Sequence, residues 1–112
     1  MAAMLTSLTE FSDNGNSRTS TTTGHVATKP KLVIQKRKVP TGNQTVLEDD
    51  VNVVHGAEDS DGVVLPQKVS FHVVCRRSVN AISTDVDAAL AVFRDVVAGD
   101  EFGNMVSTQE WL

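Results

Sequence analysis

Cysteine and aromatic residues are scarce in this chain of 112 residues, and each shortage excludes a class of protein. A single cysteine, Cys75, cannot form an internal disulfide framework, and it leaves no CxxC pair for a zinc site. The three histidines lie far apart in the sequence. Tyrosine is absent and aromatic residues make up only 4% of the chain, so no extensive platform for stacking single-stranded bases is expected. We therefore expect neither a metal nor a cofactor.

Long apolar runs are also missing. No charged N-terminal region followed by an apolar stretch marks a signal peptide, and no apolar stretch is long enough to span a bilayer. The sequence thus predicts a soluble protein that is made in a reducing compartment and has no membrane partner. A length of 112 residues predicts one domain, spanning 1–112, whose thin core would gain from a partner subunit.

Charge is distributed unevenly along the chain, although the net charge is only −4. Five of the ten basic residues fall between Lys29 and Lys38, whereas the part from Asp85 onward is acidic and has Arg94 as its lone basic residue. If the strands and helices form opposite faces, the molecule is basic on one side and acidic on the other. The basic side could bind a polyanion. Equally, these lysines and arginines could simply solubilise the strand surfaces.

The most regular pattern runs from Lys68 to Arg77, where apolar and polar residues alternate. This period of two predicts a β-strand with one face in the core and the other toward water or a polar partner. His72 and Cys75 would point to opposite faces, which argues against nucleophilic or metal chemistry, and we expect no enzymatic activity. One face carries Val69, Phe71, Val73 and Cys75, and the other carries Ser70, His72, Val74 and Arg76.

Turn signals at regular intervals divide the preceding part of the chain. The pair Asn14-Gly15 suits a tight turn and predicts an N-terminal hairpin within 1–28. A second turn is predicted at 40–43, and the polar, acidic segment 55–62 is predicted to be a loop without the spacing of a calcium site. The sequential order favours an antiparallel meander over 31–79. The predicted strands are 4–11, 18–28, 31–39, 44–54 and 68–79, with a brief strand at 63–65.

Two helices are predicted within 83–112. Ser83 or Thr84 is placed to cap the first helix, and Gly99 is placed to end it. A shorter amphipathic helix is predicted from about Asp100 to Trp111, and the apolar end of the chain is expected to dock on its own subunit or on a partner. Apolar side chains recur at helical spacing at Val86, Ala89, Leu90, Phe93 and Val97, and then at Phe102, Met105 and Val106.

Four segments carry a family resemblance. LTSLTEFSDNG, from Leu5 to Gly15, looks like an opening strand and turn, and GVVLP, from Gly62 to Pro66, looks like the end of a loop before a last strand. The strand 68–77 and the helix that starts at Ser83 also fit. In this order the elements resemble the coat proteins of single-stranded RNA bacteriophages, the levivirus group, over nearly the whole chain.

The resemblance implies an α+β fold with an N-terminal hairpin, an antiparallel meander sheet and two C-terminal helices packing on one face. Such proteins form an intertwined dimer, in which two sheets join edge to edge and each subunit's helices pack over the partner's sheet. Dimers assemble into an icosahedral shell whose inner sheet face contacts genomic RNA. In many members this face also binds an RNA hairpin that represses translation. The chain would then be a structural virion protein, assembled in the host bacterial cytoplasm, with itself and single-stranded RNA as partners.

The resemblance also assigns residues to the interfaces between subunits. Helix residues expected at the dimer interface are Val86, Leu90, Phe93, Val97, Phe102 and Trp111. The loop before the last strand would meet its copies around the symmetry axes, and the residues expected there are Glu58, Asp59, Asp61, Leu65 and Pro66.

The RNA-facing residues depend on which side of each strand is covered by helices. In 31–39, a core made by Leu32 and Ile34 would turn Lys31, Gln35 and Arg37 toward RNA, whereas a core made by Val33 and Val39 would turn Lys36 and Lys38 toward it. The larger Leu32 and Ile34 favour the first choice. Acidic residues at 48–50 are expected to pair with 36–38 across the hairpin or to lie near the rim. The predicted RNA-binding residues are Lys31, Gln35, Arg37, Thr45, Ser70, His72 and Arg76.

Two other classes of protein fit the same pattern. A strand followed by two helices also describes the β-ribbon DNA readers, so a small dimeric nucleic-acid-binding regulator is an alternative. The several strands before this unit and the acidic net charge argue against it. A dimeric interaction module that binds no nucleic acid is the second alternative. Particle formation separates the coat-protein hypothesis from both.

Overall fold

The computed structural model describes residues 4–38 and 45–112. The chain divides into two compact units, one ending at Arg76 and the other spanning 77–112, and each is described by itself. In the part of the chain that the structure describes, no helix is both long and apolar enough to cross a membrane. The prediction that 1–112 forms a single domain stays a prediction.

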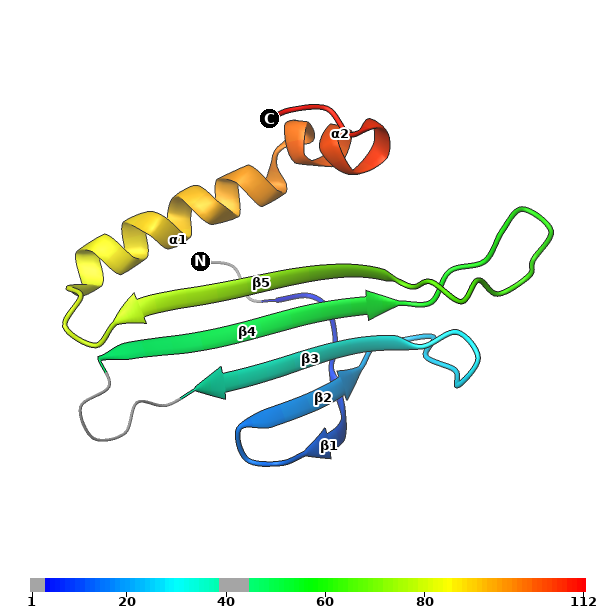
Figure 1. The fold of residues 1–112 in the computed structure, drawn as a ribbon, viewed down its shortest axis with the longest axis horizontal. Coiled ribbons are helices and arrows are strands. Elements are labelled where there is room, and N and C mark those ends of the chain that lie inside the picture. Colours follow the sequence, from blue (N-terminus) through cyan, green and yellow to red (C-terminus); the bar gives the residue numbers. More distant parts are fainter. Residues whose placement is uncertain (1–3, 39–44) are drawn as a thin grey trace. The chain divides into compact units, whose positions relative to one another are not determined.

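The first unit is a sheet of antiparallel strands that follow one another in the order of the sequence (Figure 1). This order confirms the predicted meander, and the two helices that follow it confirm the predicted α+β class. The packing of the helices on one face stays a prediction. The strands are β1 (Thr9–Asp13), β2 (Ser17–Thr21), β3 (Lys31–Lys38), β4 (Val46–His55) and β5 (Val69–Ser78).

The tight turn between β1 and β2 forms where Asn14-Gly15 predicted it. Gly15 has a φ of 83°, a conformation that a side chain would strain. Its N–H donates a hydrogen bond of 2.8 Å to Asp13 Oδ1, and the Arg18 guanidinium donates one of 3.0 Å to Asp13 Oδ2. The Gly15 N–H, together with the Arg18 guanidinium, holds the pKa of the exposed Asp13 carboxyl below its ordinary value. Local side-chain chemistry therefore closes this hairpin.

Several predicted strand boundaries are wrong by a few residues. The first strand begins at Thr9 rather than at residue 4, and the second ends at Thr21 rather than at residue 28. The Thr-rich stretch after Thr21 folds into a loop instead, because His25 Nδ1 accepts a hydrogen bond of 3.0 Å from the Lys31 N–H. The brief strand predicted at 63–65 is an isolated bridge between Glu58 and Val64. The predicted turn at 40–43 lies outside the described residues.

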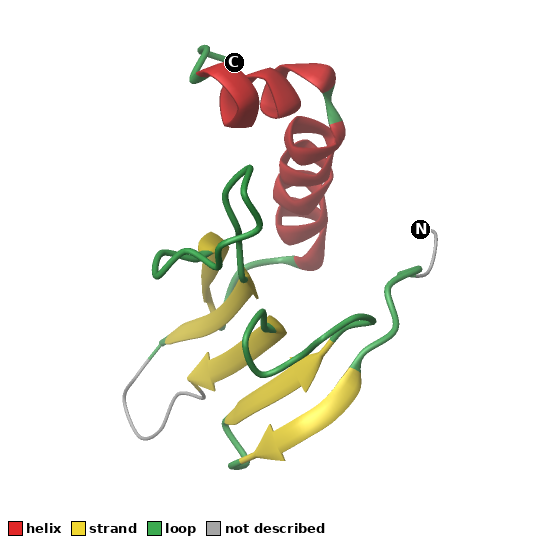
Figure 2. Ribbon diagram, turned by 90° about the vertical axis from the view of Figure 1, so that its right-hand side faces the viewer, coloured by secondary structure: helices red, strands yellow, loops and turns green. Residues whose placement is uncertain are grey.

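The second unit consists of α1 (Ser83–Ala98) and α2 (Asp100–Thr108), which contact each other (Figure 2). The predicted cap at Ser83 or Thr84 is wrong: Ile82 occupies the capping position, and no side chain caps the helix. Gly99 ends α1 as predicted, and its extended backbone (φ −76°, ψ 155°) also starts α2. The second helix ends at Thr108, three residues before the predicted end at Trp111.

The chain by itself buries little hydrophobic surface. Among the described residues, no hydrophobic side chain is buried, and Ser20 is the one buried polar residue. Phe71 and Val73 of β5 are 41% and 38% exposed, and Phe93 of α1 is 44% exposed. Because burial of apolar surface is the main stabilising contribution to folding, neither unit gains much stability by itself.

Candidate nucleic-acid interface

The register of the sheet determines which residues share a face. Residues directly opposite each other on antiparallel strands point to the same side of the sheet. Lys36 lies opposite Asp50 and Lys38 opposite Glu48, so these four side chains share one face. The residues between them, such as Arg37 opposite Asp49, point to the other face.

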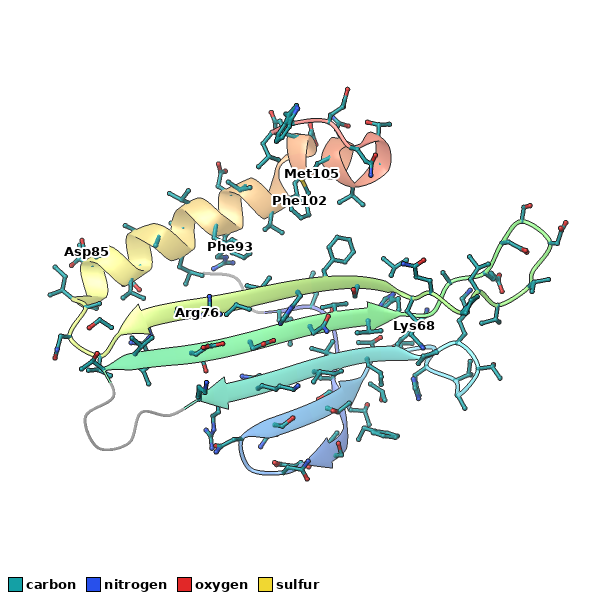
Figure 3. The ribbon with its side chains drawn as sticks, in the orientation of Figure 1. Lys68, Arg76, Asp85, Phe93, Phe102 and Met105 are labelled. Carbon is teal, nitrogen blue, oxygen red and sulfur yellow. The ribbon has the colours of Figure 1, made fainter. Side chains whose placement is uncertain are left out.

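Two ion pairs connect β5 to this pattern. His72 Nε2 contacts Asp50 Oδ1, and Arg76 Nε lies 3.4 Å from Glu48 Oε2. Side chains in contact across neighbouring strands lie on the same side of a sheet, so His72 and Arg76 share the face of Asp50 and Glu48. In Figure 3, Arg76 lies toward the C-terminal end of β5, and Lys68 lies just before its N-terminal end.

We call this surface the His72 face, and alternation along each strand gives its members. Those on β2 to β4 are Ser17, Thr19, Thr21, Leu32, Ile34, Lys36, Lys38, Glu48, Asp50, Asn52 and Val54, and those on β5 are Ser70, His72, Val74 and Arg76. The opposite surface, the Phe71 face, is the more apolar. Its members on β2 to β4 are Arg18, Ser20, Lys31, Val33, Gln35, Arg37, Leu47, Asp49, Val51, Val53 and His55, and those on β5 are Val69, Phe71, Val73 and Cys75.

The electrostatics of the His72 face are mixed. Its carboxylates are partly enclosed, with the side chains of Asp50 and Glu48 24% and 28% exposed. Both carboxylates are held by cationic or protonatable groups of β5. Within the described residues, the ammonium groups of Lys36 and Lys38 have no carboxylate within 4.0 Å. Unpaired cations on a sheet surface are the groups that a polyanion contacts first.

The predicted RNA-binding residues do not lie together. Ser70, His72 and Arg76 share the His72 face. Lys31, Gln35 and Arg37 lie on the opposite, Phe71 face, so the favoured choice of core residues in β3 is inconsistent with the choice made in β5. Thr45 is exposed and lies one residue before β4. The alternative choice, which turned Lys36 and Lys38 toward RNA, is the one that agrees with His72 and Arg76.

The charges of β3 and β4 predicted the pairing of these two strands, but not which face of β3 is shared with β5. The acidic residues of 48–50 lie near the start of β4, directly opposite Lys36, Arg37 and Lys38, as the expected cross-strand pairing requires. Size favoured Leu32 and Ile34 as core residues, but these two residues lie on the same face as His72 and Arg76. Side-chain volume alone therefore chose residues of β3 that do not share a face with His72 and Arg76.

The loop between β4 and β5 is folded by its own hydrogen bonds. Asp59 Oδ1 accepts bonds of 2.9 Å from the Asp61 N–H and 3.0 Å from the Val63 N–H. Glu58 lies 3.5 Å from Lys29 Nζ, which connects this loop to the one between β2 and β3. In the described chain, no group of three or more histidine, cysteine or acidic side chains could hold a metal ion. The assignment of Glu58, Asp59, Asp61, Leu65 and Pro66 to a subunit interface stays a prediction.

The helix residues predicted at a dimer interface lie at the surface of their unit. Leu90, Phe93 and Val97 are 39%, 44% and 42% exposed, and Trp111 is 98% exposed. Val86 and Phe102 are half-buried. Phe102 and Met105 lie on α2, as Figure 3 shows. Their contact with a second subunit stays a prediction.

Known proteins match this chain in structure but not in sequence. No protein-family model matches the chain, and no curated protein sequence matches it. The fold is similar to that in the virus-like particle of Wenzhou levi-like virus 4, with a TM-score of 0.83 at 10% identity over 96% of this chain and 79% of that chain. It is similar to the virus-like particle of Beihai levi-like virus 21, with a TM-score of 0.79 at 9% identity over 96% of this chain and 87% of that one.

A phage structure extends the comparison. The virus-like particle of bacteriophage GQ-907 matches all of this chain and 88% of its own, with a TM-score of 0.75 at 11% identity. The chain therefore has the fold of levi-like virus and phage coat proteins, and the resemblance predicted from the order of its elements is confirmed at the level of fold. Identities near a tenth explain why a sequence match is missing while the architecture is retained.

Proposed function

We propose that this chain is a viral coat protein of the RNA-phage type, with a structural rather than an enzymatic role. The observation that carries the proposal is the combination of this particle-forming fold with the lack of any buried hydrophobic side chain among the described residues. A chain that cannot cover its apolar side chains alone gains stability from self-association. The proposed location is the virion, after assembly in the bacterial cytoplasm.

The proposed building block is a dimer. Strand β5, ten residues long, lies at the end of the strand order, so among the described residues no further strand is placed along one of its edges. An exposed edge of this length pairs readily with another strand, and a second copy of β5 would extend the sheet. The apolar side chains of the Phe71 face and of α1 would then supply the contacts between subunits. Leu90, Phe93, Val97 and Trp111 are exposed in the chain by itself, which supports this assignment.

The proposed RNA contact is the His72 face. Ser70, His72, Arg76, Lys36 and Lys38 combine hydroxyl, imidazole and cationic groups on one surface, and phosphates and unpaired bases are bound by such groups. The helices have an acidic excess, with Asp85 in the first turn of α1 and Asp100 and Glu101 in that of α2. An acidic outer surface would keep particles apart in solution. Repression of translation through an RNA hairpin would use the same His72 face.

The first experiment is expression in bacteria, followed by size-exclusion chromatography, negative-stain electron microscopy and an ultraviolet spectrum of the particle fraction. We expect uniform shells whose spectrum shows nucleic acid that nuclease does not remove. Discrete dimers without shells, under several salt conditions, would reject the coat-protein proposal and favour a regulator or an interaction module. Shells that contain no RNA would reject the RNA part alone.

A further inference from the structure

A hollow of about 340 Å³ is lined mainly by residues of the β1–β2 turn and the His72 face, and Arg37 of the Phe71 face also contributes to its wall. It opens between the turn that joins β1 to β2 and the neighbouring ends of β3 and β4. These three segments lie at the same end of the sheet in Figure 1. Its lining includes the amide side chains of Asn14 and Asn16, the cations Lys36 and Lys38, and the carboxylates of Glu48 and Asp50. The volume falls at the small end of the range of small-molecule sites.

The hairpin wall of the hollow is held in place by a chain of polar contacts. Arg37 Nε donates a hydrogen bond of 3.2 Å to Asn16 Oδ1, and the Arg37 N–H donates one of 2.9 Å to the Asn16 carbonyl oxygen. These bonds attach the turn to the end of β3. The Asn14 side-chain amide has no hydrogen bond to another described side chain or backbone group. Asn14 therefore offers a donor and an acceptor at the wall of the hollow.

The carboxylates of the hollow are in ion pairs with residues of β5, whereas its two lysines form no ion pair with a described residue. Glu48 and Asp50 are engaged from the far side by Arg76 and His72 of β5. The Arg76 guanidinium offsets the negative charge of Glu48, and the His72 imidazole contacts the Asp50 carboxylate. Lys36 and Lys38 share one face and are exposed. Two available ammonium groups beside an available amide match the phosphate and the base edge of a nucleotide.

We propose that this hollow binds one unpaired nucleotide of single-stranded RNA. Lys36 and Lys38 hold the phosphates that flank it, and the Asn14 amide bonds to the edge of its base. This inference rests on the proposed RNA-binding function and adds to it a position at the hairpin end of the sheet. The nucleotide must be unpaired, because base pairing occupies the edge that the amide would read. None of the described residues that line the hollow is aromatic, so base recognition relies on hydrogen bonds rather than on stacking.

The test measures the affinity of the purified full-length protein for short oligoadenylate and oligouridylate at several salt concentrations. The variant Lys36→Ala/Lys38→Ala is compared with Lys31→Ala, a matched control on the same strand but the opposite face. We expect the double variant to lose about two- to fivefold in affinity for each lysine. Its salt slope should fall by about 0.7 for each phosphate contact that is lost. Lys31→Ala should match the wild type in both.

A second variant separates base recognition from attraction of phosphate. Asn14→Ala should weaken binding of at least one of the two oligonucleotides without changing its salt slope, and should leave binding of inorganic polyphosphate unchanged. An unchanged affinity of Asn14→Ala for both RNAs would overturn the base contact. A wild-type salt slope in the lysine double variant would overturn the site while leaving RNA binding by the chain intact. Failure of the wild-type protein to bind either RNA would reject the proposed function itself.

Discussion

The two faces of the sheet are made by the same strands, and they differ in what they expose. Val73 and Val74 are neighbours in β5, with 38% and 36% of their surface exposed, yet Val73 lies among the apolar residues of the Phe71 face and Val74 among the polar residues of the His72 face. Val73 and Val74 are therefore similarly exposed in the free chain although they lie on different surfaces. Under the proposed function, one face is covered by protein and the other meets RNA.

The largest expected effect comes from placing a charge on each of these neighbours. Val73→Asp should abolish dimers and particles, because an uncompensated charge buried at a subunit interface costs roughly 3–5 kcal/mol. Val74→Asp should still form particles, with less RNA inside them. Size-exclusion chromatography and electron microscopy of both variants provide the measurement. Particles formed equally well by both variants would show that the Phe71 face is not covered on assembly.

Chemical labelling tests the same contrast without adding a charge. Cys75 lies on the Phe71 face and is exposed in the free chain. In assembled protein we expect a small maleimide to label Cys75 at least about tenfold more slowly than in denatured protein, because a covered thiol is not accessible to the reagent. The matched control carries Cys75→Ser together with Ser70→Cys, which moves the thiol to the His72 face. Equal labelling rates at the two positions would contradict the assignment of faces.

A subtler contrast lies in β4, where adjacent acidic residues point to opposite faces. Asp50 is on the His72 face, and Asp49 stands opposite Arg37 on the Phe71 face. Asp50→Asn should raise RNA affinity about two- to fivefold, because it removes a negative charge from the surface that meets phosphate. Asp49→Asn should leave RNA affinity unchanged. Filter binding to a single-stranded RNA measures both affinities. If Asp49→Asn alone raised the RNA affinity, the Phe71 face rather than the His72 face would be the one that contacts RNA.

The smallest effect is expected at the β1–β2 hairpin turn. The pKa of the Asp13 carboxyl is lower in the folded chain than in the unfolded chain, so this group stabilises the fold above the unfolded pKa. The stabilisation is lost as pH falls through the folded pKa. Asp13→Asn should therefore lower stability slightly near neutral pH and leave it unchanged in strong acid. Denaturant titrations of both proteins at neutral and acidic pH provide the check, and an equal deficit at both would show that the contribution is not electrostatic.

Elements set by local interactions were predictable from the sequence. The first helix covers the apolar residues that recur at helical spacing, and it ends before Gly99, as the glycine indicated. The β1–β2 turn lies at Asn14-Gly15, where the backbone needs a positive φ. The failures were also local in cause. Helix α1 starts without a side-chain cap, and the Thr-rich run after Thr21 leaves the sheet because hydrogen bonds fold it into a loop. Propensity describes an average over many contexts, and specific contacts override it.

The sequence by itself determined the order of the elements, the alternation within each strand and the family resemblance, because these depend on neighbours along the chain. It could not decide which alternate set of β3 shares a face with His72. Only the tertiary structure decided that Lys36 and Lys38 join His72 and Arg76, while Lys31 and Arg37 point away. The physical reason is that strand register depends on contacts between distant segments, and a shift of one residue moves every side chain to the opposite face.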